Sequence, residues 1–459
     1  MKQWKVRVLL VCPLDFRYGR KEMLSVFSEE NRLMTMLSVE RELALAEAKY
    51  GLVPKDAAKA IEKAVNGKLV KPERVKEIEG EIGHDVMAMV RALSEVAGEG
   101  GAYVHYGATS NDIIDTATAI QLREAIRLLK AGLIELETIL SRRAIEEKNT
   151  VMLGRTHGQA ALPITFGLKL SVFLAEIDRH LDRLIEAEKR VVVGKISGAV
   201  GTGASLGKNF FELQEELMSR LGIELEIASG QIVGRDRYAE LISVLSNIAS
   251  SLEKMATEIR NLQRTEIDEV EESFDVEKQV GSSTMAQKRN PVLSENICGL
   301  ARIVRAMLVP SFENMIMWHE RDLTNSSAER ITLPHACILT DDIIQKSCKL
   351  FSNLRVKREN MSRNLEKVKG LIMSERVMLY LADSMGRQNA HEAVRQAAMK
   401  TYETGISFEE ALLSNSEISK HLKKEELQNL LNPYSYTGHA AKIVETVVTQ
   451  IRNRRALRS

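Results

Sequence analysis

Apolar residues in the middle of the chain recur at the spacing of one long, packed helix. Four of them, at positions 238, 245, 252 and 259, repeat every seven residues, with a second apolar position between them. The full set is Tyr238, Leu241, Ile242, Leu245, Ile248, Leu252, Met255, Ile259 and Leu262. Such a repeat is typical of a helix whose apolar seam packs in a bundle. We therefore predict a long bundle helix over this stretch.

Two further stretches predict helices of similar length. Residues 111–148 carry a similar pattern and begin at an Asn-Asp pair that suits a helix cap. Another helix is expected from about residue 164 to residue 193. The eight prolines leave residues 73–162 and 164–290 without the strongest helix breaker, and strand signals are sparse. The chain is therefore predicted to be all-α, with an elongated helical bundle at its centre.

This bundle separates three predicted helical domains. A smaller N-terminal domain covers residues 1–107, the long central bundle covers 108–356, and a C-terminal helical domain covers 357–459. A chain of 459 residues is long enough for about two to four domains.

Composition and charge exclude several classes of partner. Hydrophobic residues make up 44% of the chain and charged residues 28%, as in an ordinary soluble globular protein. The formal net charge of +1 argues against nucleic acid and anionic membrane surfaces as partners. No apolar run approaches the ~20 residues of a membrane helix. The four cysteines are scattered, which fits a reducing cytoplasm, so we expect a cytoplasmic protein.

The first sixteen residues, MKQWKVRVLLVCPLDF, join a basic start to a short apolar run that Arg7 interrupts. No small-residue cleavage motif follows this run. We interpret the stretch as a leading segment or short strand, in preference to a signal peptide.

Four polar islands interrupt the predicted helices: GHDVMAMV (83–90), HYGATSNDIIDTA (105–117), GRTHGQAALP (154–163) and GSSTMAQKRNP (281–291). The first three have ordinary structural explanations, because Asp85, Thr109 and Ser110 suit helix caps and His157 suits a satisfied core histidine. The fourth island, GSSTMAQKRNP, has three possible explanations: a solvated connector, a phosphate-binding loop, or a mobile loop that carries catalytic residues. Because ligand sites of bundles form at breaks between long helices, the four islands together favour a ligand site.

Known metal and nucleotide motifs are missing from the sequence. No pattern comparable to H-E-x-x-H occurs, and the island around His157 offers no nearby carboxylate. The glycine-rich segment 197–207 fails the dinucleotide fingerprint because Leu206 stands at the third glycine, which favours a turn between helices. GSSTMAQKRNP does not contain the P-loop pattern. We expect neither a metal nor a cofactor.

The islands resemble conserved blocks of one enzyme superfamily. GSSTMAQKRNP is similar to the signature loop of the fumarase/aspartase superfamily, written G-S-S-x-M-P-x-K-x-N, and HYGATSNDIIDTA and GRTHGQAALPITFGLKL resemble its two other blocks. Within that superfamily, the adenylosuccinate lyase family is the most similar, on FRYGRKEM, GHDVMA, VGKISGAVGT, QIVGRDRYAE and WHERDLTNSSAERITLP. Together these blocks cover about residues 17–334 in that family's order.

The resemblance implies β-elimination of fumarate from two small-molecule nucleotide substrates. One is adenylosuccinate, which yields AMP, and the other is succinylaminoimidazole carboxamide ribotide, which yields the carboxamide ribotide. The resemblance also implies a homotetramer whose central helices form a twenty-helix core. Each active site would then be assembled from three subunits.

The catalytic set that the resemblance implies is Ser282, His157, His84, Lys288 and Glu295. The first serine of the loop is the expected general base, and Lys288 favours its alkoxide. His157 is the expected general acid for the leaving nitrogen, oriented by Glu295. His84 is expected near the substrate phosphate or in proton transfer, and ranks below His157 as the acid.

The substrate-binding set implied by the resemblance is Arg17, Tyr18, Asp85, His105, Thr109, Ser110, Thr156, Gln231, Asn290, Arg321, Ser326 and Arg330. The succinyl moiety is expected at Thr109, Ser110 and Gln231, with its carboxylates also held by Lys288 and Asn290. The nucleotide is expected at Arg17, Tyr18, Arg321, Ser326 and Arg330, because a guanidinium fork complements phosphate oxygens. The structural alternative for the last two arginines is surface pairing with Asp322 and Glu329.

Two positions depart from the family pattern. Ala286 stands where the loop usually has proline, which should loosen the loop without removing a reacting group. Ala160 stands where some members carry a second histidine, so any role of that histidine is in doubt here.

Other functions stay open at this point. Argininosuccinate lyase and carboxymuconate cycloisomerase share the loop and the bundle, but they need no nucleotide-phosphate set like WHERDLTNSSAER. A non-catalytic, crystallin-like structural protein is the alternative from another class. Retention of the catalytic residues argues against it.

Overall fold

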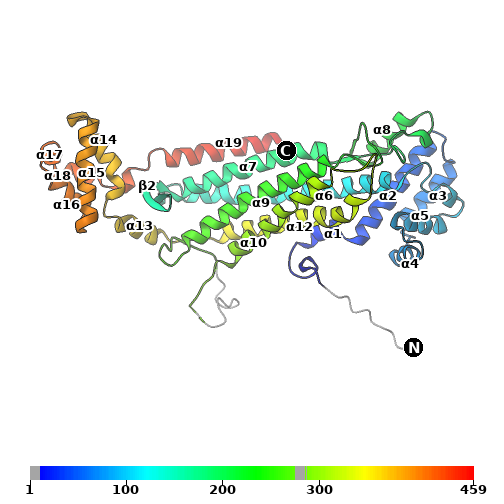
Figure 1. Ribbon diagram of the computed structural model, residues 1–459, viewed down its shortest axis with the longest axis horizontal. Helices are drawn as coiled ribbons and strands as arrows, with labels where there is room; N and C mark the ends of the chain where they lie inside the picture. Colours follow the sequence, from blue (N-terminus) through cyan, green and yellow to red (C-terminus); the bar gives the residue numbers. More distant parts are fainter. Residues whose placement is uncertain (1–10, 274–284, 286, 459) are drawn as a thin grey trace. The chain divides into compact units, whose positions relative to one another are not determined.

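The structure is a computed structural model that describes residues 11–273, 285 and 287–458. Within these residues it contains nineteen α-helices, a few 3-10 turns and three two-stranded sheets (Figure 1). The prediction of an all-α fold is confirmed. In the same part of the chain, no helix has both the length and the apolar character needed to cross a bilayer.

Four long helices make up the middle of the chain: α6 (Ser110–Glu146), α7 (Phe166–Val191), α9 (Asp236–Leu262) and α12 (Thr324–Asn353). The first three confirm the helices predicted from the apolar pattern, to within a few residues. The fourth continues through Pro334. A proline inside a helix costs one backbone hydrogen bond, so the packing of this helix outweighs the local penalty.

The apolar seam predicted on α9 is buried along its whole length. All nine of its residues, from Tyr238 to Leu262, are at most 4% exposed. Full burial of one such side chain stabilises the fold by roughly 1.5–3 kcal/mol, so this seam is a large part of the driving force for bundle formation.

The chain divides into two compact units, and the first contains residues 1–134, 179–253 and 297–345. Its shorter helices are α1 (Lys21–Val26), α2 (Glu29–Lys49), α3 (Lys55–Asn66), α4 (Pro72–Ile82), α5 (Asp85–Val96), α8 (Phe210–Leu221) and α11 (Leu308–Glu313). β3 (Val193–Gly194) pairs with β4 (Glu224–Leu225) in parallel. The glycine-rich segment 197–207 is a connection with one 3-10 turn, as predicted.

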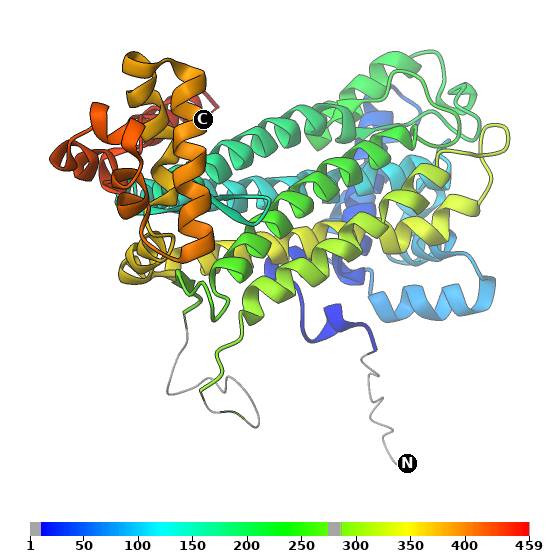
Figure 2. The same ribbon diagram turned by 60° about the vertical axis from the view of Figure 1, so that its left-hand side comes forward.

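The second unit contains residues 135–178, 254–296 and 346–459. β1 (Val151–Thr156) and β2 (Gln159–Thr165) form an antiparallel hairpin that the sequence did not predict, and β5 (Val270–Glu271) pairs with β6 (Arg355–Val356). α10 (Val292–Ala306) begins in this unit. The C-terminal helices, dark yellow to red in Figure 2, are α13 (Arg358–Lys367), α14 (Ser374–Met385), α15 (Arg387–Thr404), α16 (Phe408–Leu413), α17 (Ser416–His421), α18 (Lys424–Leu430) and α19 (Ala440–Arg458).

The C-terminal helices of this unit have a core of their own. Leu381 on α14, Phe408 and Leu412 on α16 and Leu427 on α18 are fully buried against one another. The three domain ranges 1–107, 108–356 and 357–459 stay a prediction.

Candidate active site

The start of α6, in the first unit, is held by a buried ion pair. Lys195 Nζ lies 2.5 Å from Asp112 Oδ1, and both side chains are 0% exposed. The carboxylate of Asp112 also accepts hydrogen bonds from the backbone N–H groups of Thr109 (2.9 Å), Ser197 (3.0 Å) and Gly198 (3.0 Å). A carboxylate three residues inside a helix satisfies N–H groups that have no partner within the helix. Asp112 therefore fixes the turn that carries the predicted pair Thr109 and Ser110.

The same buried lysine connects this turn to a second predicted residue. Lys195 Nζ donates to the backbone carbonyl of Gln231 at 2.8 Å. At the other end of that residue, Arg321 donates to the side-chain Oε1 of Gln231 at 2.9 Å. Gln231 is thus fixed by its backbone and its side chain, and Arg321 is brought against it. The Nε atom of Arg321 is buried and makes no hydrogen bond within the described part of the chain.

A second carboxylate on the same face of α6 holds a buried arginine. Asp115 lies one turn after Asp112, and its carboxylate is 2.8 Å from the guanidinium of Arg235, which is only 3% exposed. Arg235 also pairs with Glu329 at 2.8 Å and lies over the ring of Tyr238. Burial raises the pKa of Glu329, and Arg235 opposes this rise.

The structure bears on the structural alternative for Arg321 and Arg330, which was surface pairing with Asp322 and Glu329. Glu329 is bound to Arg235, and Asp322 accepts from the backbone N–H groups of Trp318 and Thr324. Arg330 instead forms an ion pair with Asp85 at 3.0 Å. For Arg330 the alternative is wrong, because its ion pair is with Asp85. For Arg321, both acidic residues lie close enough to act on its charge, but their carboxylates bind other groups.

Asp85 connects α5 to two arginines. Its carboxylate lies 3.2 Å from Arg32 on α2 and 3.0 Å from Arg330 on α12. Burial opposes ionisation of Asp85, but its hydrogen bonds and the two guanidinium groups outweigh this effect and lower its pKa. His84 occupies the N-cap of α5, where its Nδ1 accepts from the backbone N–H of Met87 at 3.3 Å. Two predicted residues, Asp85 and Arg330, are therefore in contact, with His84 adjacent in the chain.

His105 lies in the loop before α6 and is gripped by a glutamate. The carboxylate of Glu40 on α2 lies 2.6 Å from His105 Nδ1 and accepts the backbone N–H of His105 at 3.1 Å. Burial disfavours the imidazolium, but the hydrogen bond and charge of Glu40, with the charge of Asp112, outweigh it and raise the pKa of His105.

Three further predicted residues of the first unit, Arg17, Tyr18 and Ser326, lie outside these clusters of paired charges. Arg17 is exposed and Tyr18 is half-buried, and both backbone N–H groups bond to the carbonyl of Pro13. Ser326 is half-buried in the first turn of α12.

In the second unit, His157 stands at the tip of the β1–β2 hairpin. Thr156 pairs with Gln159, which leaves His157 and Gly158 as a two-residue loop. Their φ angles are +53° and +74°, the backbone of a type I′ turn that matches the twist of a hairpin. His157 is exposed, so its interpretation as a satisfied core histidine is wrong for the single chain.

The hairpin is anchored one residue before Thr156. Arg155 makes two hydrogen bonds to the fully buried carboxylate of Glu269, at 2.7 and 3.0 Å. Asn364 on α13 donates to the same carboxylate at 2.9 Å. A bidentate pair of this kind restricts the orientation of both groups. The hairpin therefore presents His157 from a fixed base.

Ser282 lies outside the described residues, and only the end of the signature loop is described. Lys288 is exposed and Asn290 is half-buried. Arg289, between them, pairs with Glu271 at 2.6 Å, and Glu271 also pairs with Lys357 at 2.8 Å. The loop thus ends at a point held by ion pairs.

Glu295 lies exposed in the first turn of α10. The N-terminus of this helix is capped by Glu272, which accepts from the backbone N–H groups of Leu293 (3.0 Å) and Ser294 (2.8 Å). Within the described residues no hydrogen bond joins Glu295 to His157. The predicted contact, in which Glu295 orients His157, is therefore not formed between the described residues of a single chain.

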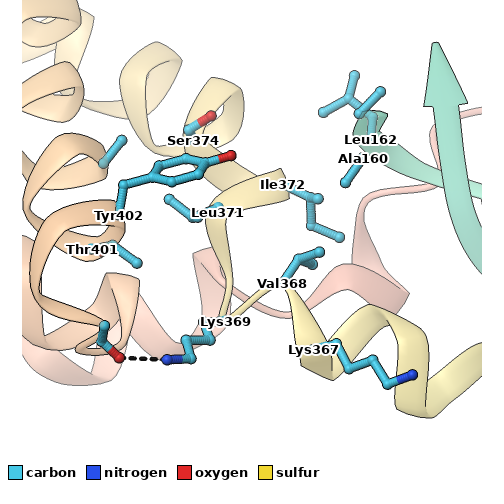
Figure 3. Close-up of a pocket in the computed structure, with 13 residues that line it drawn as sticks. Ala160, Leu162, Lys367, Val368, Lys369, Leu371, Ile372, Ser374, Thr401 and Tyr402 are labelled. Atoms are coloured by element: carbon cyan, nitrogen blue, oxygen red, sulfur yellow. Dashed lines mark hydrogen bonds between the residues drawn. The ribbon is translucent and has the colours of Figure 1, made fainter. Parts of the chain in front are cut away.

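The second unit also contains a cavity of about 670 Å³ between β2 and the C-terminal helices. Figure 3 shows Tyr402 of α15 and Lys369 on one side and Ala160 and Leu162 of β2 on the other. Lys369 Nζ donates to the carbonyl of Gly405. None of the predicted site residues lines this cavity, so it is separate from the candidate active site.

Several of the residues that hold the site were missed from the sequence: Glu40, Asp112, Asp115, Lys195 and Arg235. The signal for two of them was the pair of acids three residues apart in NDIIDT, of which Asp112 was interpreted only as part of a helix cap and Asp115 was not considered. Among the described residues, no group of three or more His, Cys, Asp and Glu side chains is arranged to hold a metal ion.

Comparison with known proteins identifies the family to which the chain belongs. Residues 16–306 match the family model described as Lyase, and residues 370–447 match the one described as Adenylosuccinate lyase C-terminus. A 3-carboxy-cis,cis-muconate lactonizing enzyme from Pseudomonas putida has the same fold, with a TM-score of 0.87, 34% identity, and coverage of 95% of this chain and 98% of its own. The fold and the matched family model define a lyase of the fumarase/aspartase superfamily.

Curated relatives narrow this class. The chain is 49% identical to an adenylosuccinate lyase of Methanocaldococcus jannaschii over 97% of both chains. It is 50% identical to one of Pyrococcus abyssi over 96% of this chain and 98% of that one. The chain belongs to the adenylosuccinate lyase family.

Proposed function

We propose that this enzyme removes fumarate from adenylosuccinate, giving AMP, and from succinylaminoimidazole carboxamide ribotide, giving the carboxamide ribotide. The observation that supports this most is the arrangement around Asp112 and Lys195. It holds Thr109, Gln231 and Arg321 together, and Arg321 keeps a buried N–H without a partner among the described residues. Donors fixed in this way suit a substrate that carries carboxylate and phosphate groups.

In the proposed reaction, a base removes a proton from the carbon next to a succinyl carboxylate. The electron pair of that C–H bond forms the double bond of fumarate, and the C–N bond breaks with its pair on the nitrogen. We assign the base to Ser282, with Lys288 and Asn290 stabilising the negative charge that develops beside it. His157 donates the proton that the leaving nitrogen takes up.

The nucleotide end of the substrate is assigned to the arginine set. Arg17, Arg321 and Arg330 carry guanidinium groups that complement phosphate oxygens, with Tyr18 and Ser326 as further donors. Asp85 and His84 complete this end, since Asp85 already holds Arg330 in place. Arg330 keeps further N–H donors for a ligand, because a guanidinium has five.

We propose a homotetramer in which each active site is shared between three subunits. Support comes from His157 and Glu295, which are both exposed and make no mutual hydrogen bond among the described residues. In the tetramer, Glu295 of a neighbouring subunit would orient His157. The same proposal includes the twenty-helix core, the three domain ranges 1–107, 108–356 and 357–459, and a cytoplasmic location.

The test is to mix purified protein with adenylosuccinate and follow the loss of its ultraviolet absorbance, with fumarate measured separately. Argininosuccinate and carboxymuconate serve as control substrates, because they are the substrates of the two rival enzymes, argininosuccinate lyase and carboxymuconate cycloisomerase. Turnover of adenylosuccinate alone is expected. A well-folded protein that cleaves a control substrate and leaves adenylosuccinate intact contradicts the proposal.

The assignment of the base has its own test. Ser282→Ala should abolish turnover and leave substrate binding measurable, because it removes the reacting oxygen and keeps the residues that hold the substrate. The neighbouring Ser283→Ala is the matched control and should keep most of the activity. A near-normal rate for Ser282→Ala would assign the base to another residue.

A further inference from the structure

The predicted substrate-binding histidine of the first unit has a dedicated partner that no part of the proposed mechanism uses. Glu40 on α2 is only 2% exposed, and both of its carboxylate oxygens bond to His105, one to the ring and one to the backbone N–H. A buried carboxylate is stable only when it is paired or fully hydrogen-bonded. Among the described residues, His105 supplies both hydrogen bonds to this carboxylate.

The backbone of His105 is adapted to this contact. Its φ angle of +64° lies in the left-handed region, which is uncommon for residues other than glycine and is energetically unfavourable. The bidentate grip of Glu40 compensates this cost and leaves the ring only one orientation. Nε2 is then the ring nitrogen left for a ligand, since the described residues offer it no hydrogen bond.

The charges around the ring balance only if His105 is a cation. Asp112 on α6 is paired with the buried Lys195, so its charge is already compensated. Glu47 lies two turns along α2 from Glu40, and burial with the charge of Glu40 raises its pKa to about 9, which keeps it neutral. Among Glu40, Glu47, Asp112 and Lys195, only Glu40 is left with an uncompensated charge. An imidazolium at His105 neutralises this charge.

We propose that Glu40 is a positioning residue that holds His105 as an imidazolium, whose Nε2–H binds a carboxylate of the succinyl group. The succinyl end is favoured over the phosphate because His105 lies four and five residues before Thr109 and Ser110. The loop between them is short and held, since Gly107 accepts a hydrogen bond from Ser205 and Thr109 bonds to Asp112. This inference rests on the proposed function for the identity of the substrate.

Glu40→Gln tests the proposal, because it removes the charge and keeps the size and one acceptor. Inhibition by the two products is measured between pH 5.5 and pH 9. Fumarate carries the carboxylates and no phosphate, and AMP carries the phosphate and no succinyl group. In the variant, the pH above which fumarate inhibition weakens should fall by about one unit or more, since an ion pair shifts a pKa by about that much. AMP inhibition should change less than about threefold.

Glu47→Gln is the matched control, because it is a buried glutamate on the same helix that already lacks a charge. Its pH profile for fumarate should match that of the unaltered protein. If the role of Glu40 were purely structural, the variant would bind both products more weakly at every pH. The proposal instead requires that low pH restores fumarate binding. Loss of AMP binding alone would assign His105 to the phosphate and overturn the proposal.

A second measurement separates failure of this inference from failure of the proposed function. The ring-carbon NMR signals of histidine are titrated in the substrate-free protein, with His105 assigned from a His105→Asn variant. Glu40→Gln should lower the pKa of His105, whatever reaction the enzyme catalyses. An unchanged titration overturns the inference, and absence of adenylosuccinate cleavage by the unaltered protein overturns the function.

Discussion

Replacement of Lys195 by methionine should be among the most damaging single changes in the first unit. The substitution keeps much of the volume and removes one member of a pair in which both side chains are 0% exposed. Asp112 would keep its three backbone N–H donors but lose its counter-charge. Breaking a buried pair from one side costs about 3–5 kcal/mol, because the remaining charge is desolvated and uncompensated. Domains are stable by only about 5–15 kcal/mol, so a large share of the stability is lost.

The assay is urea unfolding followed by circular dichroism, with steady-state kinetics of the folded variant. Lys195→Met should lower the free energy of unfolding by about 3–5 kcal/mol and raise the KM for adenylosuccinate, because Gln231 loses the donor that holds its carbonyl. Adding Asp112→Asn to Lys195→Met should recover part of the loss, with a coupling of about 1–3 kcal/mol.

Arg395→Met breaks an exposed pair with Glu392 on α15 and is the matched control. Its unfolding midpoint should stay essentially unchanged, because exposed pairs contribute little. A loss below about 1 kcal/mol for Lys195→Met, together with simple additivity in the double variant, would refute the positioning role of the pair.

Two further changes test the hairpin and the buried acid. Gly158→Ala should destabilise the fold by about 1–2 kcal/mol and lower kcat, because a Cβ meets open space there but φ is +74°. The control, Gly299→Ala, lies in a helix with equal space and should stabilise the fold by about 0.5–1 kcal/mol. Equal effects of the two substitutions would contradict the role of the positive φ angle. The pKa of Glu47 is about 4.5 in the unfolded chain and about 9 in the folded one. Between these two pH values only the folded state keeps the proton, so this group lowers the free energy of unfolding as the pH rises. The stability of Glu47→Gln relative to the unaltered protein should therefore rise by up to about 1.4 kcal/mol per pH unit from pH 5 to pH 9, and a flat difference in urea unfolding would contradict the assigned shift.

The helical organisation could be predicted from the sequence because it depends on local periodicity. The seam from Tyr238 to Leu262 repeats at helical spacing, and that spacing alone determines which face is apolar. The hairpin 151–165 could not be predicted, because its signal is a His-Gly pair with positive φ rather than the Asn-Gly or Asp-Gly that marks such turns. Proline at 334 misleads in the opposite sense, since tertiary packing keeps α12 continuous through it.

The candidate site likewise contains residues that the sequence could identify and residues that it could not. Motif residues such as Thr109, Gln231 and Arg321 were recognisable as a set, because their blocks resemble those of one family. Their support was not recognisable, since Asp112 and Lys195 are 83 residues apart in the chain and neither stands in a pattern that names the other.

By itself, the sequence determined the all-α fold, the long helices and the family's reaction, because apolar periodicity and motif blocks are properties of neighbouring positions. Only the tertiary structure decided which charges meet. It pairs Lys195 with Asp112, Arg235 with both Asp115 and Glu329, and Glu40 with His105. Buried charges must find partners, and those partners are chosen by the packing of distant helices rather than by spacing along the chain.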